Sequence, residues 1–151
     1  MNAKPRLLYA VDPALSISGG VSVIVQTLIK HFSQNYHVYL LSSDHPDDFS
    51  HHKIFPYLTG HIQWCPPKGH LQLAYLRYTK EVARQIKDTR MDYVHFHSGF
   101  YGWGNRFLGL SLPRHLRKLG IPCLWTSHSG LQMMIGFSHP RLPILLKRPC
   151  L

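Results

Sequence analysis

Small and polar residues follow three apolar runs of the sequence, and their types suit the binding of a phosphorylated or hydroxyl-rich ligand. Glycine lets a ligand approach the backbone closely, while imidazole and hydroxyl groups can hydrogen-bond sugar hydroxyls or phosphate oxygens. The residues that share this placement are Asp12, Gly19, Gly20, His97, Ser98, His128 and Ser129. Their recurrence after separate apolar runs predicts one binding site built from several strand ends.

The paired glycines Gly19 and Gly20 stand at the start of an amphipathic segment. Apolar residues then recur with helical spacing, at Val21, Ile24, Val25, Leu28, Ile29 and Phe32. The first N–H groups of such a helix have no internal partner, and with the helix dipole they favour a bound phosphate. The pair is not part of a GxGxxG or Gly-Lys-Ser/Thr fingerprint. A tight turn that needs glycine for its geometry alone is the alternative interpretation.

Two histidines, His95 and His97, are two residues apart in a predicted strand and therefore point to the same face. We expect His97, at the strand end, to be accessible and His95 to be hydrogen-bonded within the core. A zinc site at His97 and His128 is disfavoured because no Cys, Asp or Glu accompanies them at ligand spacing. A serine hydrolase is disfavoured because the sequence contains no GxSxG elbow.

Short apolar runs alternate with helical patterns along the chain, which indicates parallel β-α-β units. We predict an α/β fold with a doubly wound, Rossmann-like parallel sheet, helices on both faces and strand order 3-2-1-4-5. Ligands of such sheets bind beyond the carboxyl ends of the strands, where the strand order reverses. The predicted strands are Arg6 to Val11, His37 to Ser43, His61 to Cys65, Asp92 to His97 and Cys123 to His128.

The length of 151 residues fits one domain, which we place at residues 1–139, followed by an irregular and apparently truncated tail at residues 140–151. The three cysteines are odd in number and lack metal-type spacing, so they fit a reduced, cytoplasmic protein. No apolar run reaches the roughly 20 residues that a membrane span needs.

The charge balance is strongly basic, with 17 Lys and Arg against 7 Asp and Glu, and no acidic residue follows Asp92. Such a field attracts nucleic acid, anionic membrane or phosphorylated ligands. Nucleic acid is disfavoured because the chain has no recognition helix, aromatic RNA-binding motif or zinc spacing. A solvated basic face without a partner is the remaining alternative.

Four ordered segments resemble the N-terminal domain of family 4 glycosyltransferases, which are retaining enzymes of the GT-B architecture. The segments are GGVSVIVQTLIKHF, HVYLLSS, DYVHFHSGF and GIPCLWTSHSG, and the likeness runs from Arg6 to about Met134. The resemblance implies one half of a GT-B enzyme that transfers a sugar, of hexosyl type, from a nucleotide sugar to an acceptor with retention. It also implies that no metal or other cofactor is required.

The same resemblance suggests roles for the strand-end residues. Gly19 and Gly20 match the loop that approaches the donor diphosphate, and His97 with Ser98 matches the position beside the acceptor pocket. His128 matches the histidine that lines the active site near the transferred sugar, so it is the candidate catalytic residue.

The second domain of GT-B enzymes, which binds the nucleotide sugar, has no counterpart in the sequence. We therefore expect a fragment, a frameshifted product or a half that a partner completes, and we expect this chain alone to be inactive. The implied partners are a nucleotide-sugar donor and a glycan, lipid-linked or small-molecule acceptor. Arg114, Arg117 and Lys118 suggest peripheral contact with an anionic membrane at its inner face.

A non-catalytic nucleotide- or sugar-binding module of the same fold is the alternative function. Such a module would keep the glycine turn but would need neither His97 nor His128. A basic nucleic-acid-binding protein is a weaker alternative, because charge alone supports it.

Overall fold

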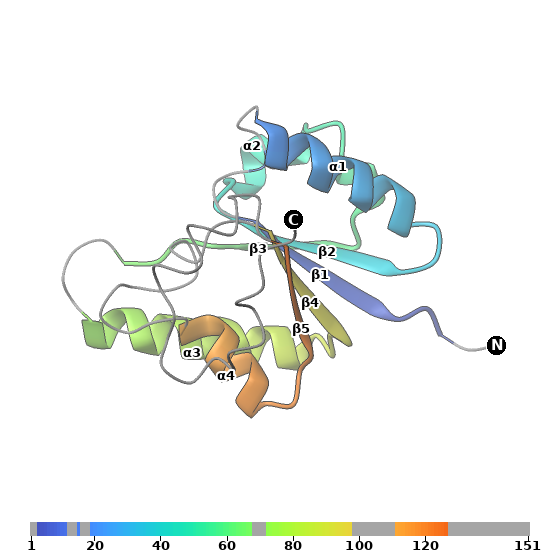
Figure 1. Cartoon of the computed structure of the whole chain (residues 1–151). Coiled ribbons are helices and arrows are strands. Elements are labelled where there is room, and N and C mark those ends of the chain that lie inside the picture. Colours follow the sequence, from blue (N-terminus) through green and yellow to red (C-terminus); the bar gives the residue numbers. More distant parts are fainter. Residues whose placement is uncertain (1–2, 12–14, 16–18, 68–71, 98–110, 127–151) are drawn as a thin grey trace, which may run out of the picture.

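A computed structural model describes residues 3–11, 15, 19–67, 72–97 and 111–126 of the chain. These residues form a five-stranded parallel sheet in the order β3-β2-β1-β4-β5, which confirms the predicted fold class and strand order (Figure 1). The strands are β1 (Arg6–Val11), β2 (His37–Ser42), β3 (Gly60–Gln63), β4 (Tyr93–His97) and β5 (Cys123–Thr126).

Helices cover both faces of this sheet (Figure 1). The helices α1 (Gly20–Phe32) and α2 (Pro46–Ser50) lie on one face, while α3 (Gln72–Asp88) and α4 (Ser111–Lys118) lie together on the other. A short 3-10 turn, η1 (Phe55–Tyr57), precedes β3. The described part of the chain contains no helix with the length and apolar character needed to cross a bilayer.

Strand β1 contributes to both hydrophobic layers, which explains why its sequence is continuously apolar. Leu8 and Ala10 pack in the layer beneath α3 and α4, whereas Tyr9 and Val11 pack in the layer beneath α1. Strand β4 alternates in the same way, with Val94 and Phe96 facing α3 and α4. The histidines of β4 therefore face α1.

The region between β2 and β3, for which the sequence predicts no helix or strand, contains the short helix α2 and contributes to the core. Pro46 occupies the first turn of α2, where its missing N–H costs no helical hydrogen bond. Phe49 and Ile54 from this region are buried in the layer beneath α1. A helix of five residues is too short to produce a helical period in the sequence.

A glycine and a proline separate α4 from β5. Gly120 has φ +76°, a left-handed conformation that glycine adopts without steric cost, and Pro122 follows two residues later. Strand β5 pairs in parallel with β4, so that His97 is opposite Thr126. The predicted last two residues of this strand and the tail at residues 140–151 lie outside the described residues.

Candidate functional site

The N-terminus of α1 is open. Gly19 is the residue before the helix and has extended backbone, with φ −178° and ψ 163°; no side-chain hydrogen bond caps the helix, and its first turn holds no acidic residue. Hydrogen bonding within the helix begins with Val23, whose N–H donates to the carbonyl of Gly19 at 3.1 Å. The N–H groups of Gly20, Val21 and Ser22 therefore have no acceptor within the helix.

Turn geometry alone does not explain the two glycines. Gly19 is extended, Gly20 begins the helix, and neither has the positive φ that favours glycine. A Cβ atom placed on either residue would meet nothing in the described chain within 4 Å. Because glycine has no side chain, the backbone at Gly19 and Gly20 is exposed and no atom of the described residues stands where a Cβ would point, which is the arrangement that an approaching anion needs.

The prediction that His97 is accessible was wrong, whereas the predicted hydrogen bond of His95 is present. His97 is 1% exposed, whereas His95 is half-buried and its Nε2 lies 2.8 Å from Oγ1 of Thr126. The hydrophobic layer beneath α1 extends to the end of the strand, because Val11, the register partner of His97, and Leu15 are both buried. His97 therefore reaches the predicted strand end but belongs to the protein interior.

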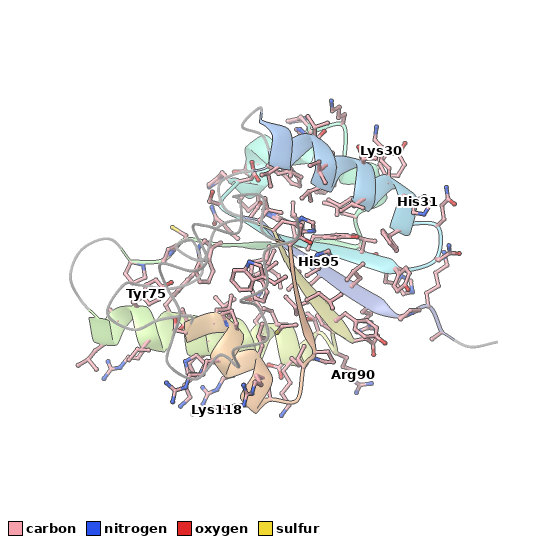
Figure 2. All side chains as sticks on the ribbon, in the orientation of Figure 1. Lys30, His31, Tyr75, Arg90, His95 and Lys118 are labelled. Atoms are coloured by element: carbon pink, nitrogen blue, oxygen red, sulfur yellow. The ribbon has the colours of Figure 1, made fainter. Side chains whose placement is uncertain are left out.

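An aromatic cluster surrounds these histidines. The ring centroids of His95 and His97 are 4.0 Å apart, and the ring of Tyr9 lies 5.6 Å from the first and 5.5 Å from the second. Figure 2 shows His95 between the sheet and α1. Burial raises the pKa of Tyr9 above its ordinary value, and Tyr36 adds to this effect, so the phenol stays neutral.

Four of the predicted site residues lie outside the described residues: Asp12, Ser98, His128 and Ser129. Their convergence with the glycine pair stays a prediction. Within the described ranges, no three His, Cys, Asp or Glu side chains are grouped as a metal ion would require.

A polar network that joins the carboxyl end of β2 to His61 of β3 was missed from the sequence. The carboxylate of Asp44 is 4% exposed, and its Oδ2 accepts hydrogen bonds from Oγ of Ser42 at 2.6 Å and from the N–H of Leu15 at 2.7 Å. Nε2 of His61 lies 3.0 Å from Oγ of Ser42. The sequence feature that could have indicated this network is Asp44, an acidic residue that closes the motif Ser42-Ser43-Asp44 at the end of a buried strand.

The hydrogen bonds fix the roles of the atoms in this network. Because Ser42 donates its only proton to Asp44, the hydrogen of the bond between Ser42 and His61 belongs to Nε2 of His61. Burial lowers the pKa of His61, although Asp44 acts in the opposite direction, so the imidazole is neutral at neutral pH. Ser42 is fully buried and bound to a carboxylate, which excludes it as a hydrolase nucleophile.

A basic surface lies on the opposite face of the molecule, over α3 and α4. Arg114, Arg117 and Lys118 are exposed on α4, which confirms that one short helix carries them. Burial lowers the pKa of His115, and the charges of Lys118, Lys80 and Arg114 lower it further, so these cations gather around one imidazole. Figure 2 places Lys118 on this side and Lys30 on the far side, over α1.

Comparison with known proteins places the chain among glycosyltransferases. Residues 18–149 match the family model described as Glycosyltransferase Family 4. A glycosyltransferase from Rickettsia africae is 18% identical with a TM-score of 0.55, over 82% of this chain and 30% of that one. The C-terminal domain of a hydrogenase from Pyrococcus furiosus is 16% identical with a TM-score of 0.54, over 83% of this chain and 92% of that one. No curated protein sequence matched.

The two structural similarities establish the fold, and the family match establishes the relationship. The chain spans less than one third of the length of the Rickettsia africae glycosyltransferase, since it covers 30% of it.

Proposed function

The chain belongs to glycosyltransferase family 4, and from this membership we propose that it is the acceptor-side half of a GT-B enzyme. In this proposal the enzyme transfers a hexosyl group from a nucleotide sugar to an acceptor, with retention at the anomeric carbon. The single observation that supports the proposal most is the open N-terminus of α1, where three N–H groups have no acceptor within the helix and follow or include the exposed glycines Gly19 and Gly20.

The N–H groups of Gly20, Val21 and Ser22 are proposed to hold the diphosphate of the donor. When the bond between sugar and diphosphate breaks, negative charge accumulates on the phosphate oxygens. Fixed N–H donors and the positive end of a helix dipole stabilise that charge without reorganising. This contribution requires no metal ion, in keeping with the proposed metal-free reaction.

The other predicted residues have distinct places in this proposal. His128 acts near the transferred sugar as the catalytic residue, and Asp12, Ser98 and Ser129 line the same edge of the sheet. His97, which is buried against Tyr9, supports the end of β4 from inside and does not contact the substrate directly.

We assign the binding of the donor nucleotide to a second domain that these 151 residues do not supply. The chain covers 30% of the Rickettsia africae glycosyltransferase, which leaves room in that protein for such a domain. This chain alone is therefore expected not to turn over a nucleotide sugar. We further propose that the enzyme acts in the cytoplasm.

The direct test is transfer by the purified 151-residue chain, assayed with a panel of nucleotide sugars and acceptors. The half-enzyme proposal predicts no transfer, together with weak binding of pyrophosphate at the N-terminus of α1. Measurable transfer would contradict the need for a second domain. Binding of the probe combined with full activity of a His128→Ala variant, measured once a donor domain is supplied, would favour a non-catalytic role for His128.

The basic surface over α3 and α4 is proposed to contact an anionic membrane or a lipid-linked acceptor. Lys118, Lys80 and Arg114 gather around His115. On the surface of α3, Glu81 pairs with Arg84 at 3.6 Å. Several unopposed cations on one face bind anionic lipid through its surface potential.

Flotation with vesicles of phosphatidylglycerol and phosphatidylcholine tests this contact. The Arg114→Gln/Arg117→Gln/Lys118→Gln variant is expected to lose vesicle binding. A matched control removes three exposed charges elsewhere, with Lys4→Gln/Lys30→Gln/Lys53→Gln, and is expected to keep it. Equal loss in both variants would show that net charge alone governs binding and would contradict a defined surface.

A further inference from the structure

We propose that Asp44 is a positioning residue, which holds Leu15, between β1 and α1, from just beyond the end of β2 and so orients the open N-terminus of α1. The inference rests on the proposed function, because it identifies what holds the phosphate-facing backbone in place. Asp44 does not contact the proposed ligand; it acts through Leu15 and Ser22.

Leu15 lies in the connection between β1 and α1, and both of its backbone polar groups bond to side chains from other parts of the fold. Its N–H donates to Oδ2 of Asp44 at 2.7 Å, across 29 residues of sequence. Its carbonyl accepts a hydrogen bond from Oγ of Ser22 at 2.6 Å. The side chain of Leu15 is fully buried in the layer beneath α1. The N–H, the carbonyl and the side chain of Leu15 are therefore each fixed by a separate contact.

Ser22 connects this anchor to the proposed phosphate site. It belongs to the first turn of α1, and its buried hydroxyl also accepts a hydrogen bond from Nε2 of Gln26 at 2.9 Å, one turn later in the helix. The N–H of Ser22 is one of the three open donors. Two hydrogen bonds thus link Asp44, at the end of β2, to the first turn of α1.

The carboxylate of Asp44 is itself held in place. The hydroxyl of Ser42 converges on the same Oδ2 atom, and His61 bonds to that hydroxyl from β3. The ring of Phe49 lies 5.0 Å from that of His61 and closes the network on the side of α2. A buried carboxylate that accepts two short bonds is a strong and directional acceptor. Strands β2 and β3 thereby determine where Leu15 lies.

Amide hydrogen exchange tests this anchor without any ligand. Asp44→Ala removes the acceptor, and the exchange rate of the Leu15 amide is expected to rise about 10-fold to 100-fold, since a buried donor loses its partner. Asp44→Asn keeps an acceptor oxygen in place, so it should restore much of the protection. The Leu15 amide proton should also move upfield in both variants, because the charged acceptor is lost.

Asp47→Ala is the matched control. Asp47 lies three residues away, its side chain is 91% exposed, and it contacts His45 at 3.6 Å. This variant should leave the exchange and chemical shift of Leu15 unchanged. If Asp44→Ala fails to fold, the same exchange measurement is made on Ser22→Ala, which removes the hydrogen bond to the carbonyl of Leu15. Thr27→Ala, on the exposed surface of α1, is the control for that variant.

The second measurement links the anchor to binding, with inorganic pyrophosphate as the probe in an NMR titration. Asp44→Ala is expected to weaken the binding of pyrophosphate about 10-fold. The loss of affinity in Asp44→Asn is expected to be smaller. Unchanged exchange at Leu15, or a rise that is equal throughout β1, would overturn the anchoring role. If pyrophosphate does not bind to the unmodified chain, the proposed function fails, while the exchange data still decide the anchor.

Discussion

Replacing Gly20 by alanine is expected to strengthen the fold and to weaken ligand binding. Gly20 is the first residue of α1, it lacks a positive φ, and an added Cβ would meet no described atom within 4 Å. Alanine therefore costs no strain in the folded state and restricts the unfolded chain, which should raise the free energy of unfolding by about 0.4–1 kcal/mol.

The effect on binding has the opposite sign. The methyl group would occupy the open space through which an anion reaches the N–H groups of the first turn. Loss of one hydrogen bond to a charged group costs about 1.5–3 kcal/mol, so the Kd for pyrophosphate should rise about 10-fold to 150-fold. Urea unfolding measures the first effect, and NMR titration of the same sample measures the second.

Gly120→Ala is the control for this experiment, because Gly120 has φ +76° and lies in the turn after α4. That variant should lose about 1–2 kcal/mol of stability and keep its affinity for pyrophosphate. Destabilisation by Gly20→Ala would show that the turn needs glycine for its geometry. Unchanged affinity in the stabilised Gly20→Ala protein would refute the anion site.

Three further predictions concern packing and titration. Ile29→Val, in the fully buried stripe of α1, should cost about 0.5–1.5 kcal/mol in urea unfolding, while Ile24→Val, on the exposed side, should cost almost nothing. Burial lowers the pKa of His61 in the folded protein, so the unfolded chain binds more protons than the folded chain at pH values between that lowered pKa and 6.5. The free energy of unfolding should therefore rise as the pH rises through this window, and the rise should be smaller in the His61→Gln variant. Added salt should raise the pKa of His115 measured by NMR, because it screens the neighbouring cations; a salt-independent pKa would contradict the cluster.

The sequence predicted the strand order because local patterns determine it. The continuous apolar run of β1 and the helical spacing from Val21 to Phe32 each reflect a single element in contact with the sheet. Alternation of such elements, with right-handed crossovers, leaves few arrangements of the strands. The open N-terminus of α1 followed from the same local reasoning.

The burial of His97 and the role of Asp44 depend on contacts between distant segments, which no local pattern encodes. His97 was expected to be exposed because it ends a strand, but buried Val11 and Leu15 show that the interior continues past this point. Asp44 was not among the predicted site residues, yet its carboxylate accepts a hydrogen bond from a backbone N–H 29 residues earlier. Its neighbour in the network, His61, belongs to another strand.

The most direct test of the central claim is an NMR titration of the folded chain with inorganic pyrophosphate, with the backbone amides assigned. The account predicts that the largest and saturable shifts occur at Gly20, Val21 and Ser22, at the N-terminus of α1. Shifts confined to the basic surface around His115, or no shift in the first turn of α1 at any concentration, would contradict it.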